Sequence, residues 1–286
     1  MDQASLQPML PSAMTDNCTK PTTPSGALVT VMIAAHNRRV MLEEAIASCL
    51  AQDWTPLRVL VVDDGSDPEI ALWLDDWAEE EARLHVIHQP RRGVAAARAR
   101  GLLAAEDGWI CILDSDDRLA RGAVRKIMQR LLAPDRPDVI YTGNRHFLPD
   151  GSERVVSYPR YPDNASMLSA VLTRPIIPFK HSGTVASRRT FLIAGGYDPR
   201  LRIKVDIDLF VRFLVRGWRL ELMPEPLVWF RMHGKSMSRR RLRGIVAWWK
   251  IVDRHVEGSI MFHWKVKVMR AAAEFAKAGY ALICLR

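Results

Sequence analysis

The chain of 286 residues carries 41 Lys and Arg against 32 Asp and Glu, a formal net charge of +9, and 48% of its residues are hydrophobic. This length and apolar fraction are typical of a globular protein with one large or two small domains, so a disordered, collagenous or coiled-coil chain is excluded. Charges or prolines interrupt every apolar run before it reaches the roughly 18 residues that a spanning helix needs, so an integral membrane protein is not expected.

The first 26 residues are expected to form a flexible tail. They contain four prolines among Ser and Thr, with neither a basic start nor an apolar core, which is not the pattern of a signal peptide. A cytoplasmic location is therefore expected. The cysteines lie far apart without a CxxC pair, so neither disulfides nor a zinc site is predicted; they are Cys18, Cys49, Cys111 and Cys284.

After the tail, short apolar runs alternate with helical patterns. The predicted strands span residues 28–35, 58–62, 84–88, 109–113 and 139–143. The predicted helices span residues 41–51, 68–81, 94–105 and 120–132. This order predicts an α/β fold with a mostly parallel central sheet covered by helices on both faces, and ligands bind such sheets at the carboxyl ends of the strands.

The second half of the chain has a less regular pattern. Residues 144–178 are rich in Pro, Asp, Ser and Arg, and we expect them to form a loop-rich stretch over the site. Strand patterns resume at 183–187, 219–223 and 227–230, with a helix expected over 206–216.

The basic charge is concentrated at the C-terminal end. Residues 239–286 contain 11 Lys and Arg against three acids, a net of +8, which leaves +1 for the first 238 residues. The body of the protein is therefore nearly neutral, and no specific nucleic-acid partner is predicted. Apolar residues recur at helical spacing in this segment, which indicates amphipathic helices that either pack on the domain or touch an anionic membrane surface.

Acidic residues follow two of the predicted strands. The second strand ends in Asp63-Asp64-Gly65-Ser66, which by itself is equally typical of a plain turn. The fourth strand ends in Asp114-Ser115-Asp116-Asp117, with three carboxylates within four residues. Such density is costly without a cation, so we favour a Mg²⁺ or Mn²⁺ site held together with a substrate phosphate over a helix cap.

Taken in order, these motifs resemble the family 2 glycosyltransferases of the GT-A fold, of the inverting bacterial type. The resemblance spans residues 28 to about 238 and includes Glu43-Glu44-Ala45-Ile46, Gly93 to Arg98, and Gly195-Gly196-Tyr197-Asp198. It implies three parts of the chain: a tail over 1–26, a GT-A glycosyltransferase domain over 27–238, and a basic helical extension over 239–286.

The resemblance also implies roles for the strand-end acids. Asp63 and Asp64 are expected to hold the base and ribose of the donor, with Arg98 close to the nucleotide. Asp114 is expected on the ribose side, and Asp116 is expected to bind the divalent cation that bridges the donor diphosphate. Asp117 is expected in an outer position or at the start of a helix.

The catalytic base is expected at Asp206. Asp206 shares a helical face with Leu209 and Phe210, which points it inward, and it matches the second acid of the family's Glu-Asp motif. A helix cap is the alternative role for Asp206. Asp208 and Arg212 are expected to form an exposed i,i+4 pair.

His233 lies in a Phe-Arg-Met-His segment that matches the closing motif of the family, so it is a candidate metal ligand beside Lys235, which could meet phosphate.

These features predict a metal-dependent enzyme that moves a sugar from a nucleotide-diphosphate donor, expected to be a UDP-sugar, to a glycan or lipid-linked acceptor in cell-surface polysaccharide or glycolipid synthesis. A peripheral position on the inner face of a membrane is compatible with the basic end. One alternative is a nucleotidyltransferase, although residues 34–40 lack the glycine-rich loop that this class requires. The other is a non-enzymatic nucleic-acid or membrane-binding module driven by residues 239–286.

Overall fold

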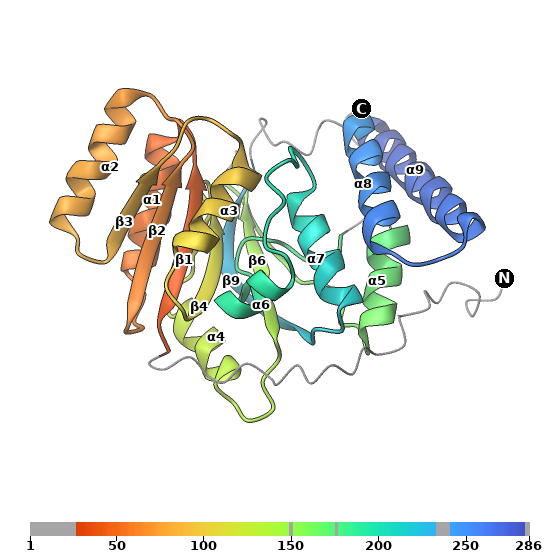
Figure 1. Ribbon diagram of the computed structural model, residues 1–286, viewed down its shortest axis with the longest axis horizontal. Helices are drawn as coiled ribbons and strands as arrows, with labels where there is room; N and C mark the ends of the chain where they lie inside the picture. The colour runs from red at the N-terminus through yellow and green to blue at the C-terminus, as the bar shows by residue number, and fades with distance from the viewer. Residues whose placement is uncertain (1–26, 149–150, 175–176, 233–240, 284–286) are drawn as a thin grey trace.

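The computed structural model describes residues 27–148, 151–174, 177–232 and 241–283, and Figure 1 shows its arrangement. The expected tail over 1–26 lies outside the described residues. The elements in chain order are β1 (Val29–Ala35), α1 (Arg39–Leu50), β2 (Leu57–Asp63), α2 (Pro68–Glu80), β3 (Leu84–His88), α3 (Val94–Ala104), β4 (Trp109–Asp114), β5 (Arg118–Leu119), α4 (Ala123–Leu131), β6 (Val139–Phe147), β7 (Glu153–Val156), α5 (Asn164–Thr173), β8 (Val185–Ser187), α6 (Arg188–Ile193), α7 (Val205–Val215), β9 (Leu220–Arg231), α8 (Arg241–His255) and α9 (Ile260–Ile283).

Within the described residues, nine strands form one sheet. Eight of them follow the order β3-β2-β1-β4-β8-β6-β9-β5, and β7 attaches to β6. The β3-β2-β1-β4 part is parallel, as the βαβ order predicts, whereas β8 is antiparallel to both of its neighbours. The α/β fold expected from the sequence is confirmed, with a sheet that becomes mixed in its second half.

The register of the central strands brings the acidic motifs to one edge. Ala35 of β1 pairs with Asp63 of β2, and its neighbour Ala34 pairs with Asp114 of β4. The two acidic motifs therefore begin on either side of the carboxyl end of β1, where a parallel sheet offers its ligand site.

Alternating residues of the strands fill two cores on opposite faces of the sheet. Val31 and Ile33 of β1 are fully buried in the core that includes residues of α1 and α4, and Met32 between them is buried with residues of α3, α6 and α7. This period of two is what a strand covered on both faces requires.

The expectation that residues 144–178 form a loop-rich stretch was wrong. β6 continues to Phe147 and pairs with β7, and α5 follows, with Asp163 accepting a hydrogen bond from the backbone N of Ser166 at 2.7 Å as its N-cap. β7 is an exposed strand with charged residues, and α5 is only ten residues long, so neither leaves a strong periodic pattern.

β9 is one strand where the sequence indicated two. Pro224 and Pro226 interrupt the apolar pattern, and the structure accommodates them with register shifts on both sides of Gly143 in β6. A Cβ atom on Gly143 would lie 2.3 Å from the carbonyl oxygen of Pro224, so only glycine fits there.

α8 packs on the body of the protein. Trp248, Ile251 and Val252 are buried in a third core together with residues of α5 and α7. Packing on the domain, one of the two interpretations of the basic segment, therefore holds for α8. The boundary at residue 239 stays a prediction. No helix in the described part of the chain is long and apolar enough to cross a membrane.

Candidate active site

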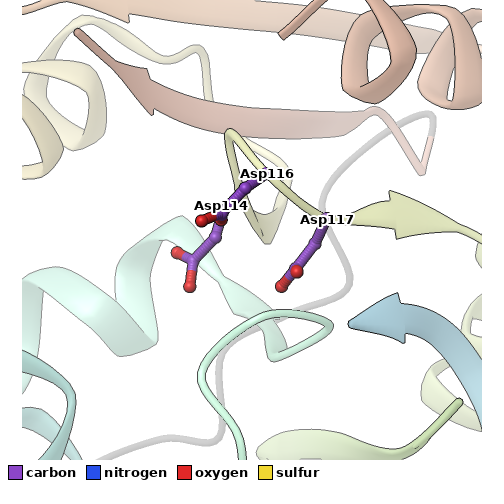
Figure 2. A group of neighbouring side chains, drawn as sticks. All are labelled: Asp114, Asp116 and Asp117. Carbon is purple, nitrogen blue, oxygen red and sulfur yellow. The ribbon is translucent and has the colours of Figure 1, made fainter. Parts of the chain in front are cut away.

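Three carboxylates converge after the end of β4. Asp114 is the last residue of β4, and Asp116 and Asp117 lie in the turn before β5 (Figure 2). One carboxylate oxygen from each lies within 4.8 Å of those of the other two. We call these three residues the strand-end cluster.

Asp117 is the most deeply buried member of the strand-end cluster. Its side chain is fully buried, and its Oδ1 accepts a hydrogen bond from the backbone N of Arg231 at 3.1 Å. Among the described residues, its Oδ2 has no hydrogen-bond partner. Burial, together with the charges of Asp114 and Asp116, raises the pKa of Asp117 well above its usual value. Asp117 therefore lies in the turn before β5 and not at the start of a helix, whereas an outer position around a cation stays a prediction.

The other two carboxylates lie beside arginines. Asp114 forms an ion pair with Arg98 of α3, and Asp116 forms one with Arg38, which follows β1. Burial acts to raise the pKa of Asp114, but the charge of Arg98 outweighs it and the pKa is lowered. Arg231 approaches from the end of β9, where its Nε donates to the carbonyl oxygen of Asp116 at 3.3 Å.

The strand-end cluster fits a hard divalent cation. Its donors are carboxylate oxygens, the ligands that Mg²⁺ and Mn²⁺ prefer, and the unpartnered Oδ2 of Asp117 is a buried acceptor that a cation would satisfy. Asp114, Asp116 and Asp117 are therefore the residues that could hold it. A cation bound there would neutralise charge on a substrate diphosphate.

Asp63 and Asp64 make contacts within the protein. Asp63 accepts hydrogen bonds from the backbone N and the hydroxyl of Ser66, and it pairs with Nδ1 of His88 at 2.9 Å. Asp64 binds the loop before α3, because its oxygens accept from Gln89 Nε2 and from the backbone N atoms of Arg92 and Gly93, each at 2.7 Å. These carboxylates fix the loops beside the strand-end cluster, and direct contact with a nucleotide stays a prediction.

Asp206 is connected to the strand-end cluster by its electrostatic interaction with Arg98. It is in the first turn of α7 and is partly exposed, and its carboxylate interacts electrostatically with Arg98 and with Tyr197. Within the described part of the chain, no hydrogen bond reaches this carboxylate. Arg98 thus links Asp114 at the end of β4 to Asp206 on α7.

His181 completes the buried surroundings of Arg98. Its Nε2 lies 2.9 Å from the hydroxyl of Tyr197, over whose ring the Arg98 guanidinium lies at 5.9 Å. Burial, and next the nearby Arg98 charge, lower the pKa of His181 to about 3. His181 is therefore a neutral imidazole at physiological pH.

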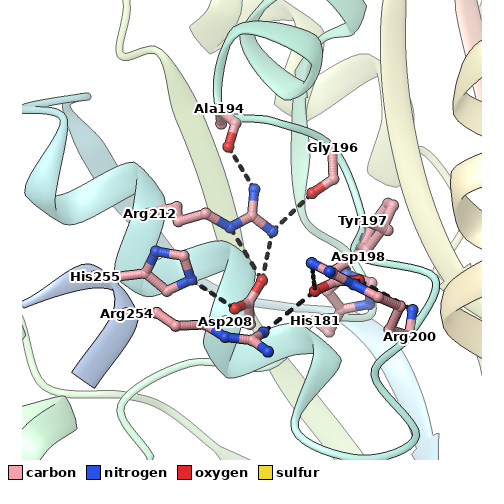
Figure 3. Close-up of polar contacts among 10 residues, drawn as sticks. All are labelled: His181, Ala194, Gly196, Tyr197, Asp198, Arg200, Asp208, Arg212, Arg254 and His255. Carbon is pink, nitrogen blue, oxygen red and sulfur yellow. Dashed lines mark hydrogen bonds and ion pairs between the residues drawn. The ribbon is translucent and has the colours of Figure 1, made fainter. Parts of the chain in front are cut away.

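The exposed pair expected at Asp208 and Arg212 is instead buried. Arg212 donates to Asp208 Oδ2 at 2.6 Å and to the carbonyl oxygens of Ala194 and Gly196 (Figure 3). His255 of α8 lies 2.9 Å from Asp208 Oδ1. The expectation was wrong because α7 is covered on this side as well, by α8 and by the 194–198 loop. We call Asp208, Arg212 and His255 the helix network.

The structure thus brings Arg98, Asp114, Asp116 and Asp206 to one region. His233 and Lys235 lie outside the described residues, so the metal-ligand prediction for His233 stays a prediction. Sequence reasoning gave no role to Arg38, directly before α1, or to Arg231, at the end of β9, and both contact the strand-end cluster. The only sequence feature that could have identified them is a basic residue close to the end of a strand. This feature is common, and it indicates a contact only when a neighbouring strand ends in acidic residues.

The model of Glycosyl transferase family 2 matches residues 30–195 of the chain. Because the match covers more than half of the sequence, the chain belongs to this family. Its curated relatives include the succinoglycan biosynthesis protein ExoO of Rhizobium meliloti (strain 1021), 29% identical over 219 residues. The alignment covers 74% of this chain and 62% of ExoO. The putative teichuronic acid biosynthesis glycosyltransferase TuaG of Bacillus subtilis (strain 168) is 23% identical over 237 residues, which cover 80% of this chain and 88% of TuaG.

Solved structures share the fold. The crystal structure of S. aureus TarS 1-349 in complex with UDP-GlcNAc matches with a TM-score of 0.65 and 16% identity, covering 87% of this chain and 72% of that one. The mannosyltransferase PcManGT from Pyrobaculum calidifontis, in complex with GDP-Man and Mn²⁺, matches with a TM-score of 0.61 and 21% identity, covering 88% and 75%. The chain thus belongs to Glycosyl transferase family 2 and has the GT-A fold. It spans less than two thirds of the length of the first curated relatives that it matches, 62% in the case of ExoO.

Proposed function

We propose that the protein moves a sugar from a UDP-sugar to an acceptor hydroxyl, with inversion at the anomeric carbon and with Mg²⁺ or Mn²⁺ as cofactor. The observation that carries the proposal is that Arg98, which forms an ion pair with Asp114 of the strand-end cluster, also interacts electrostatically with Asp206. A single displacement needs a base beside the acceptor hydroxyl and a group of residues that stabilises the leaving diphosphate.

In this proposal the donor lies along the carboxyl ends of β1, β2 and β4. The loops held by Asp63 and Asp64 border the base and ribose, and Asp114 lies on the ribose side with Arg98. Asp116, with Asp114 and Asp117, would hold the cation, whose charge would stabilise the departing diphosphate. Arg38 and Arg231 supply further positive charge beside that group.

Asp206 acts as the general base. The acceptor oxygen forms a bond to the anomeric carbon on the face opposite the diphosphate, the bond from that carbon to the diphosphate oxygen breaks, and Asp206 takes the hydroxyl proton. Such assistance contributes about 10² to 10⁴ in rate. A single displacement of this kind inverts the anomeric carbon and needs no covalent intermediate.

A cell-surface polysaccharide or glycolipid is the proposed acceptor. The relatives named for succinoglycan and teichuronic acid biosynthesis support this class. The TarS complex with UDP-GlcNAc supports a UDP-sugar, and the GDP-Man complex of PcManGT makes a GDP-sugar the donor to compare. A lipid-linked acceptor would place the protein peripherally at a membrane.

The test is a donor-hydrolysis screen across UDP- and GDP-sugars with Mn²⁺, followed by the Asp206→Asn variant on the best donor. We expect turnover to fall by at least about 10² while donor affinity stays near that of the wild type, because the carboxamide cannot accept the proton. Asp76→Asn, an exposed acid of α2, is the matched control and should keep full turnover.

Wild-type turnover in Asp206→Asn would contradict the assignment and leave Asp206 as a residue of the helix start.

A further inference from the structure

Helix α9 carries an apolar stripe that faces solvent. Its members recur at helical spacing on one face and are 57% to 81% exposed; they are Ile260, Met261, Trp264, Val268 and Phe275. Figure 1 shows α9 at the outer edge of the molecule, at the opposite end from α2. We call these five residues the α9 stripe.

The opposite side of α9 is fixed to the protein. Val266 and Arg270 are buried, and Arg270 donates to Glu274 at 2.7 Å and to the carbonyl oxygen of Arg174 after α5. The Arg270 guanidinium also lies 5.4 Å from the ring centroid of Trp248 in α8. These contacts set the rotation of the helix, so the α9 stripe points outward.

The other large exposed apolar residues of the described chain are more scattered. Leu72 of α2 and Leu103 of α3 are 63% and 68% exposed, but they lie on separate elements. Single exposed residues of this kind are ordinary on a protein surface, whereas a continuous apolar stripe marks an interaction surface.

The charges around the α9 stripe indicate its partner. Two of the three acids in residues 239–286 are paired with bases, because Asp253 contacts Lys267 at 2.6 Å and Glu274 contacts Arg270. Lys265 is exposed and lies between Met261 and Val268 at i−4 and i+3. The segment as a whole carries +8. A second copy of the chain would bring two such positive segments together, which disfavours self-association.

We propose that the α9 stripe docks on an anionic lipid surface. Trp264, Phe275 and the aliphatic members enter the boundary between headgroups and acyl chains, and Lys265 meets lipid phosphate. The helix lies along the surface, as an amphipathic helix with one apolar face does. The tryptophans of α8 are engaged within the protein, because Trp248 is buried and the Trp249 indole donates to the carbonyl oxygen of Lys267.

The experiment measures flotation of the full-length protein with vesicles of phosphatidylcholine containing about one-third phosphatidylglycerol, and with vesicles of phosphatidylcholine alone. We expect binding to the anionic vesicles that weakens as salt is raised, and much weaker binding to the neutral ones. Trp264→Ser should weaken anionic binding by at least about tenfold, because a large apolar anchor is lost. Lys265→Gln should weaken it by about fivefold.

Leu72→Ser is the matched control, because Leu72 and Trp264 are similarly exposed, at 63% and 65%, and lie at opposite ends of the molecule. It should bind vesicles as the wild type does. All variants should keep the wild-type melting temperature, since the replaced side chains contribute little packing.

Three results would overturn the proposal: no binding to either vesicle, equal binding to both, or equal losses in Trp264→Ser and Leu72→Ser. A dimer in solution that Trp264→Ser dissociates would also overturn it and assign the α9 stripe to a second copy. None of these outcomes depends on glycosyl transfer, so the proposed reaction and the lipid surface stand or fall separately.

Discussion

The strand-end cluster and the helix network each contain a buried carboxylate, that of Asp117 and that of Asp208, but the two groups balance the negative charge differently. In the helix network, one carboxylate oxygen of Asp208 is hydrogen-bonded to Arg212 and the other to His255. Arg212 also donates hydrogen bonds to two backbone carbonyl oxygens. In the strand-end cluster, Asp116 pairs with Arg38 and Asp114 pairs with Arg98. Asp117 accepts a backbone hydrogen bond from Arg231, and its buried Oδ2 is left without a partner among the described residues.

The pKa values of Asp208 and Asp117 are shifted in opposite directions, in line with how completely each carboxylate is paired. Burial acts to raise the pKa of Asp208, yet the hydrogen bond from His255 and the charge of Arg212 hold it below its usual value. Burial and neighbouring acids raise the pKa of Asp117 instead. Complete pairing therefore marks an acid that stabilises the fold, and incomplete pairing marks an acid available to a ligand.

The largest effect is expected from breaking the helix network. Asp208→Ala leaves the buried Arg212 without its counter-charge, which should lower the free energy of unfolding by about 3–5 kcal/mol. Urea denaturation followed by circular dichroism measures this change.

The matched control is Asp198→Ala, whose ion pairs with Arg200 and Arg254 lie nearer the surface. It should cost no more than about 1 kcal/mol. If both variants cost the same, the helix network is no more than a surface ion pair.

A smaller effect is expected at His181, next to Arg98. Its pKa is about 3 in the folded protein, whereas an unfolded histidine titrates near 6.5. Between these values the unfolded chain binds the extra proton, so stability falls as pH decreases, by up to about 1.4 kcal/mol per pH unit. His181→Gln should remove this part of the pH dependence, as measured by urea denaturation from pH 7 to pH 4.

His85→Gln, an exposed position of β3, should leave the slope unchanged. An unchanged slope in His181→Gln would mean that His181 has the same pKa in the folded and unfolded states, which would contradict its burial as a neutral imidazole beside Arg98.

The sequence predicted the elements and residues that depend on local patterns. Helix α2 and the β1, β2 and β4 strands have strong periods, and the acids at 63–64 and 114–117 follow strands whose register could be inferred from their parallel order. The grouping of three carboxylates was also readable, because they lie within four residues at one strand end, and the cation that they are expected to hold stays a prediction.

The sequence-based predictions that failed concern features that depend on the tertiary environment. The spacing of Asp208 and Arg212 is the same whether α7 faces solvent or α8, so only the structure shows that the pair is buried. The same holds for Trp248 and Trp264, which both lie on amphipathic patterns but end on opposite sides of the C-terminal helices. Arg38 and Arg231 were missed because their partners come from distant strands.

The most direct test of the account is the thermal shift produced by Mn²⁺ and UDP, alone and together. If the strand-end cluster binds the cation that completes the diphosphate site, the two ligands together should raise the melting temperature by more than the sum of their separate shifts. Asp116→Asn should abolish that excess, and the surface variant Asp76→Asn should retain it. An excess that persists in Asp116→Asn would show that the cation binds elsewhere and would contradict the assignment of the strand-end cluster.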